Sequence, residues 1–315
     1  MSELDRAALL QRELFLSVLT PTRPTGSMAR RVAQSMREMR FARGEVIFAK
    51  GERADSSYFV SEGIVRFDDD DADPLPFGVG DVVGIVDLNL DRPRAHTARA
   101  HTDVVLLQMN AEDWLDVQEE NVEWVIETRR FVSDLVHRLM LECADSPAHR
   151  PGIESTTESP ARPYEGTLLE TLVLLSKMIY FERASVQSVA ELARRAGRVQ
   201  VQRGAQITTE APERTMLVVA EGLVEAERRG EPNLRAWYPS GTLVLGGAGL
   251  CGVLGEYDLV ALADTQLLVL RFGEIDEVVE DHTDLSRSLM RGIAFDREHW
   301  LAVRRSRNGA ARQPT

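Results

Sequence analysis

One arginine in a short polar segment is the residue of this chain best suited to hold a small anion. Arg94 lies in the segment P-R-A-H-T at residues 93–97, and Gly84 ends the segment G-D-V-V-G at residues 80–84. A guanidinium is a planar fork of N–H donors that matches two oxygens of a phosphate group. Small residues such as Gly84 and Ala95 leave backbone N–H groups open to the same anion. These residues predict a phosphate-binding turn in which Arg94 supplies the positive charge.

The spacing resembles the phosphate-binding cassette of cyclic-nucleotide-binding domains, which reads G-D-x-x-G-E-L-A-L, then a spacer, then P-R-A-A-T. Residues 80–97 align to this pattern without a gap, and the matching positions are Gly80, Asp81, Gly84, Leu88, Pro93, Arg94, Ala95 and Thr97. The resemblance implies cyclic AMP or cyclic GMP as the ligand and no other cofactor. The ligand-binding residues that it implies are Gly84, Arg94, Ala95, His96 and Thr97.

One position of the cassette departs from the family pattern. Ile85 stands where family members carry a glutamate that accepts a hydrogen bond from the ribose 2′-hydroxyl, and isoleucine cannot accept one. A hydrogen bond to a charged group is worth roughly 1.5–3 kcal/mol, so its loss weakens binding of a ribose cyclic phosphate by about ten- to a hundred-fold. The alternative hypothesis for Arg94 is an ion pair with a nearby acid, Asp87 or Asp91.

The composition excludes several other kinds of site. The 315 residues include 37 Lys and Arg against 50 Asp and Glu, a formal net charge of −13, which argues against a nucleic-acid partner. No apolar run is long enough to cross a bilayer and no signal-peptide pattern is present, so we expect a cytoplasmic protein with no membrane partner. Cys143 and Cys251 have no metal-ligand spacing around them, so we expect neither a disulfide nor a metal site.

An internal repeat organises the chain. Gly44, Gly63, Gly80 and Ala100 recur as Gly204, Gly222, Gly241 and Ala263, at offsets of 160, 159, 161 and 163 residues. Strands rich in β-branched and aromatic residues are predicted between the turns of the first copy, at residues 45–48, 57–60, 64–67 and 104–109. The fold class predicted is mainly β with flanking helices (α+β): two jelly-roll β-barrels like those of cyclic-nucleotide-binding domains, each with N- and C-terminal helices.

Helical patterns and composition set the expected domain boundaries. Helices are predicted at residues 3–18 and 28–39, and one long helix after a cap at Asn110, with a second such stripe at residues 285–303. The expected domains are a first barrel at 1–144 and a second at 167–306. A Ser-, Thr- and Pro-containing linker at 145–166 joins them, and a basic tail follows at 307–315.

The second copy of the cassette is degenerate. Residues 241–263 contain no Lys or Arg, and they hold the acids Glu256 and Asp258, which would repel an anionic phosphate. Counting back six residues from Ala263, as from Ala100 to Arg94, reaches Tyr257 instead of an arginine. The glycines of this stretch lie outside any β-α-β context, so we interpret them as a loosened loop and not as a dinucleotide-binding motif.

Two functions remain open on the sequence. One is a regulatory protein that senses a cyclic nucleotide or a related anion through the first barrel and signals to a separate protein partner, of unknown identity. The other is a tandem-barrel scaffold or interaction module that no longer binds nucleotide, with the long helices as the surface of a homodimer. An enzyme is not expected, because the six histidines are scattered with no nucleophile or metal motif to join them. Too few residues follow the last helical stripe for a helix-turn-helix, which argues against a transcription factor.

Overall fold

The computed structural model of the chain describes residues 3–19, 26–68, 76–143 and 164–310. It consists of two compact units, one that runs to Glu127 and includes the residues from Asn308, and one from Thr128 to Arg307. Most of the expected linker lies outside the described residues. No helix in the described part of the chain is long and apolar enough to span a membrane.

Two helices precede the first barrel: α1 (Glu3–Leu19) and α2 (Gly26–Ser35). The first agrees with the helix predicted at residues 3–18, but the helix predicted at 28–39 is wrong in its last part, where β1 (Arg37–Phe41) begins. Every residue of β1 pairs with β7 (Val104–Asn110). Tertiary pairing of this kind overrides the local preference for a helix.

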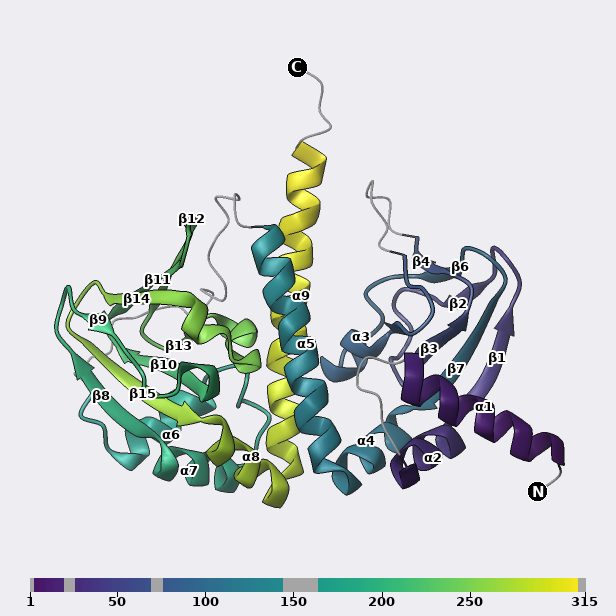
Figure 1. The fold of residues 1–315 in the computed structure, drawn as a ribbon, viewed down its shortest axis with the longest axis horizontal. Coiled ribbons are helices and arrows are strands. Elements are labelled where there is room, and N and C mark those ends of the chain that lie inside the picture. The colour runs from purple at the N-terminus through teal and green to yellow at the C-terminus, as the bar shows by residue number, and fades with distance from the viewer. Residues whose placement is uncertain (1–2, 20–25, 69–75, 144–163, 311–315) are drawn as a thin grey trace. The chain divides into compact units, whose positions relative to one another are not determined.

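The first barrel contains two antiparallel sheets, of order β1-β7-β3-β5 and β2-β6-β4 (Figure 1). Its other strands are β2 (Val46–Phe48), β3 (Ser56–Glu62), β4 (Val65–Phe67), β5 (Val82–Val83) and β6 (Ala98–Ala100). The strands predicted in the first copy are therefore confirmed. Buried apolar side chains from both sheets fill the barrel, among them Phe48, Val60, Val65, Val83 and Leu106.

The second barrel repeats this arrangement. Two helices again come first, α6 (Leu168–Ser176) and α7 (Val186–Arg195), and the sheets have the order β13-β10-β15-β8 and β12-β11-β14-β9 (Figure 1). Its strands are β8 (Gly197–Val201), β9 (Gln206–Ile207), β10 (Thr215–Glu221), β11 (Leu223–Arg228), β12 (Glu231–Pro239), β13 (Thr242–Leu243), β14 (Tyr257–Ala261) and β15 (Thr265–Arg271). Read from the opposite edge, these orders match those of the first barrel, except that β12 has no counterpart among the described strands there, and the repeat is confirmed.

Strand register corrects one of the repeat offsets. Val65 pairs with Ala100 in the first barrel, and Val224 pairs with Ala261 in the second, so Ala261 and not Ala263 is the counterpart of Ala100. The residue six positions earlier is Gly255, not Tyr257. The letters Ala-His-Thr and Ala-Asp-Thr suggested the wrong alignment, and only the hydrogen-bond ladder resolves it. The conclusion that no arginine stands there is unchanged.

The helix after each barrel is broken once. α4 (Ala111–Glu120) and α5 (Val122–Glu142) are separated by the non-helical Asn121, and α8 (Phe272–Asp281) and α9 (Thr283–Ala310) by the non-helical His282. The single long helix predicted after Asn110 is therefore wrong at Asn121, whereas the stripe predicted at residues 285–303 lies entirely within α9. α9 also continues to Ala310, inside the segment expected as a tail. In the second unit α5 packs beside α9 (Figure 1), with Cys143 Sγ 3.7 Å from the carbonyl oxygen of Trp300.

Candidate functional site

The cassette of the first barrel is a turn followed by a short helix, α3 (Ile85–Asn89). Gly84 precedes this helix with a left-handed φ of 81°. A Cβ atom on residue 84 would lie 2.5 Å from Nη1 of Arg94. Glycine is therefore required for two reasons: the backbone conformation, and the close approach of the guanidinium.

Arg94 points inward and is only 2% exposed. Its Nη1 donates to the carbonyl oxygen of Gly84 at 2.7 Å, and its Nη2 donates to that of Ser56 at 2.5 Å. The guanidinium carbon lies 4.2 Å from the centre of the Phe48 ring. The cation is therefore held by backbone carbonyls and an aromatic face.

No carboxylate in the described part of the chain forms an ion pair with Arg94, and its buried Nε has no hydrogen-bond partner there. Burial lowers the pKa of Arg94 from its ordinary value, while Tyr58 and Asp87 act in the opposite direction. A buried cation without a counter-ion has given up hydration that the protein has not fully replaced. Such a group has a strong electrostatic preference for an anionic ligand.

Asp87 does not pair with Arg94, contrary to the alternative hypothesis, but with Arg92. Its Oδ1 accepts from Nε of Arg92 at 2.8 Å, and its Oδ2 accepts from the backbone N–H of Ala95 at 3.3 Å. The carboxylate is buried, at 4% exposure. The cassette pattern has alanine at this position, so the acid was a visible signal. The Asp87 carboxylate thus accepts from the backbone N–H group of Ala95, which is expected from the sequence to bind a phosphate.

The remaining predicted site residues, Thr97 and His96, contact other segments of the first barrel. The hydroxyl oxygen of Thr97 accepts from the backbone N–H of Lys50 at 3.0 Å. The ring of His96 stacks on Phe67 of β4, with centroids 4.9 Å apart. The structure thus brings Gly84, Arg94 and Ala95 together at α3, whereas Thr97 and His96 make contacts within the barrel wall.

Residues 38–121 match the sequence profile of the cyclic nucleotide-binding domain family. The first barrel is a cyclic nucleotide-binding domain. The match includes both segments of the cassette and the strands that hold them. Because the second barrel has the same strand order apart from the additional β12, the chain carries this domain fold twice, with a degenerate second cassette.

No curated protein matches the chain. Similar solved structures include the regulatory domain of Toxoplasma gondii PKA with cAMP, at 15% identity over 92% of this chain and 96% of that one, with a TM-score of 0.34. The regulatory subunit of a cAMP-independent protein kinase A from Trypanosoma cruzi, bound to guanosine, is 16% identical over 100% and 96% of the two chains, with a TM-score of 0.32. At these TM-scores neither likeness supports an argument about ligand or mechanism.

In the second cyclic-nucleotide-binding-like domain the cassette is filled by the protein itself. Asp296 of α9 is 5% exposed, and its Oδ2 accepts from the backbone N–H of Gly247 and from the hydroxyl of Tyr180. A Cβ atom on Gly246 would lie 2.6 Å from that oxygen. Burial raises the pKa of Asp296 to about 6. Gly246 and Gly247 thus permit the close approach of this carboxylate.

The interpretation of this stretch as a loosened loop is therefore wrong. Two 3-10 turns, η2 (Gly246–Cys251) and η3 (Val253–Glu256), replace the short helix of the first domain. Leu245 precedes η2 with a left-handed φ of 63°, at the place that Gly84 holds in the first cassette. Residues 246–250 are all buried. Sequence alone missed this because Asp296 and Tyr180 are distant along the chain.

Proposed function

We propose that the chain is a cytoplasmic, non-enzymatic regulatory protein whose first domain binds one small anion of the cyclic-nucleotide type and signals its presence to a separate protein. The observation that carries the proposal is the state of Arg94, a buried guanidinium in a cassette of this family, bonded to two carbonyl oxygens and to no carboxylate. A phosphate would supply the missing negative charge and engage donors that the carbonyls leave open.

The contacts of Arg94 suggest how occupancy changes the domain. Nη1 holds the carbonyl oxygen of Gly84, the residue from which α3 begins. A ligand that competes for this donor frees the carbonyl and shifts α3. Ile85 and Leu88 of α3 pack against the apolar cluster that contains Phe15 of α1 and Trp114 of α4. A ligand that prefers one position of α3 would thereby shift the flanking helices as well.

The second candidate function, a scaffold or homodimeric interaction module that binds no nucleotide, is favoured by one specific contact. The carboxylate of Asp87 accepts a hydrogen bond from the backbone N–H of Ala95. It also adds negative charge at the position where a phosphate would bind. Ile85 offers no acceptor for a ribose hydroxyl. In this function both cassettes hold a carboxylate from their own chain.

Isothermal titration of the full chain with cyclic AMP, cyclic GMP and cyclic di-GMP separates the two functions. For the sensor we expect one site per chain, because the second cassette has no cation, and at least a hundred-fold loss of affinity in Arg94→Ala. Arg99→Ala is the matched control: this arginine lies in the same barrel but pairs with Asp68 on the surface, so its removal leaves binding unchanged.

Folding is checked for each variant by its thermal unfolding transition, and Arg94→Met is the second variant if Arg94→Ala does not fold. Equal binding by wild type and both Arg94 variants would contradict the role of Arg94. If the folded wild-type protein binds none of these ligands, the sensor function is excluded and the scaffold function remains. A single dimeric species in analytical ultracentrifugation would then support the homodimer.

A further inference from the structure

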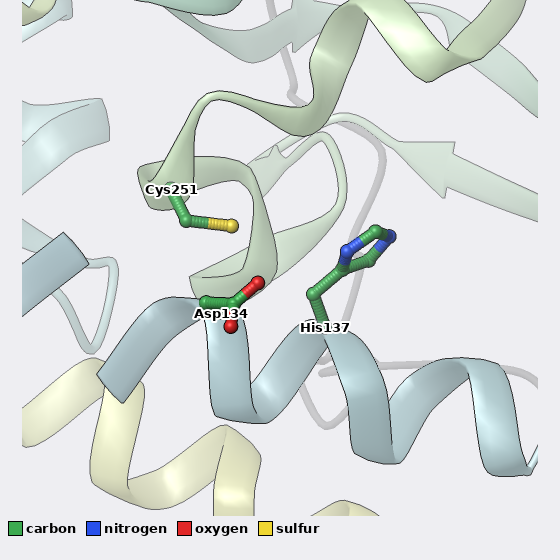
Figure 2. Close-up of side chains that lie close together, drawn as sticks. All are labelled: Asp134, His137 and Cys251. Atoms are coloured by element: carbon green, nitrogen blue, oxygen red, sulfur yellow. The ribbon is translucent and has the colours of Figure 1, made fainter. Parts of the chain in front are cut away.

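Three side chains with different metal-ligand atoms meet in the second unit (Figure 2). Asp134 and His137 are three residues apart and so share one face of α5, and Cys251 ends η2. One oxygen, one nitrogen and the sulfur from these residues all lie within 4.8 Å of one another. The sequence predicted no metal site here, because Cys251 is far from the other two along the chain.

We propose that Asp134, His137 and Cys251 bind a transition-metal ion of the Zn²⁺ type. Carboxylate oxygen, imidazole nitrogen and thiolate sulfur are the ligands that Zn²⁺ takes in proteins, and the alkaline-earth ions, which prefer all-oxygen sites, do not suit this set. Zn–N and Zn–O bonds of about 2.0 Å with a Zn–S bond of about 2.3 Å place tetrahedral ligand atoms roughly 3.5 Å apart. Small side-chain rotations close the present separation, and a water molecule completes the tetrahedron.

The imidazole is already oriented for this role. Nε2 of His137 lies 3.0 Å from the hydroxyl oxygen of Tyr257, which leaves Nδ1 as the nitrogen for a metal ion. Figure 2 shows this nitrogen on the side of the ring that faces Asp134 and Cys251. Metal-binding histidines almost always have such a second partner, which fixes the tautomer. Burial lowers the pKa of His137, which keeps the ring neutral and able to bind a metal.

The contacts that the carboxylate and the thiol make with described residues are ones that an ion can replace. Asp134 pairs with Arg138 at 2.7 Å, and that arginine side chain is 68% exposed. Sγ of Cys251 donates to the carbonyl oxygen of Ala248 at 3.0 Å. Burial raises the pKa of Cys251 to about 12, so the thiol is protonated before the ion arrives. Binding then breaks the S–H bond, forms a sulfur–metal bond and releases the proton to solvent.

Local charge favours a cation at this place. The degenerate cassette at residues 241–263 has no Lys or Arg, and Glu256 acts electrostatically on both His137 and Cys251. Arg228 and Arg138 oppose it in part. An ion here would fix η2 to α5, in the position where the first domain carries its short cassette helix. This inference does not depend on nucleotide binding by the first domain.

The test uses the full chain, reduced and stripped with a chelator, and titrated with Co²⁺ as a spectroscopic probe and with Zn²⁺ in competition. We expect the visible bands of tetrahedral Co²⁺ together with a thiolate-to-metal charge-transfer band, and their loss on addition of Zn²⁺. Cys251→Ser should abolish the charge-transfer band, and Asp134→Asn should weaken binding at least tenfold. Cys143→Ala is the control, because this buried cysteine lies outside the cluster.

Tyr257→Phe tests orientation, since the variant keeps all three ligands and removes only the hydroxyl next to Nε2; we expect binding about tenfold weaker. A second measurement uses only the wild-type protein, so it does not depend on whether the variants fold. Zn²⁺ should slow maleimide modification of Cys251, located by mass spectrometry, at least tenfold. Absence of a charge-transfer band in wild type, its persistence in Cys251→Ser, or unchanged modification with Zn²⁺ present would overturn the site.

Discussion

At the start of α3 the left-handed Gly84 lies against a buried cation, whereas the equivalent turn of the second domain, at Leu245, leads into a segment built around a buried carboxylate. The backbone turn is the same and the charge beside it is opposite. Arg94 has carbonyl oxygens as partners and no counter-ion among the described residues. Asp296 has two donors directed at one oxygen. The two domains therefore differ in what their cassettes hold: a buried cation that pairs with no described carboxylate in the first, and a carboxylate from α9 in the second.

The largest effect should come from the packing that supports Asp296. A Cβ atom on Gly292 of α9 would lie 2.2 Å from a ring carbon of Tyr180, the residue that donates to Asp296. Gly292→Ala should lower the free energy of unfolding by about 3 kcal/mol, measured in urea. The control is Gly273→Ala in α8, which meets no atom within 4 Å and should be neutral or slightly stabilising. Equal stability of the two variants would contradict the filled-cassette interpretation.

The buried carboxylate should also produce a specific pH dependence. The pKa of Asp296 is raised from 3.8 to about 6 in the folded protein, so the folded state holds the proton more tightly than the unfolded state. Stability therefore falls as the pH rises from about 4 to 6, by up to about 3 kcal/mol. Asp296→Asn should lack this decline. If the free energy of unfolding changes with pH in the same way in wild type and variant over this range, the carboxylate does not titrate there.

A third prediction concerns the missing hydrogen-bond acceptor for the ribose in the first domain. Ile85→Glu places a carboxylate where the family pattern has one, and we expect about ten- to a hundred-fold tighter binding of cyclic AMP by titration calorimetry. Cyclic AMP lacking the 2′-hydroxyl provides the control, because it should gain nothing from the substitution. An equal gain for both ligands would mean that residue 85 does not reach the ribose.

A smaller effect is expected from the charge of Asp87. Asp87→Asn keeps an oxygen that accepts from Arg92 and Ala95 but removes the negative charge beside the phosphate. We expect roughly tenfold tighter binding of a cyclic nucleotide than in wild type. Asp81→Asn, a change in a surface turn whose carboxylate holds the N–H of Gly78, is the comparison for a general change in net charge. An identical response to both substitutions would argue against a local role of Asp87.

Much of the fold followed from local patterns. The strands of the first barrel were predictable because β-branched and aromatic residues alternate with turn glycines, and the repeat because Gly44, Gly80 and their counterparts recur at nearly constant spacing. The break at Asn121 was not predictable in this way, since no glycine or proline marks it and only the backbone shows where α4 ends and α5 begins.

Arg94 could be chosen as the candidate cation from the sequence, because it belongs to a motif of contiguous residues whose spacing is set by one turn. The partners of Arg94 depend on the packing of the barrel, because Ser56 and Phe48 reach it from strands distant along the chain. The same holds for Asp296, which enters the second cassette from α9. Contacts between distant segments depend on how sheets and helices pack, and no local spacing of residue types records that packing.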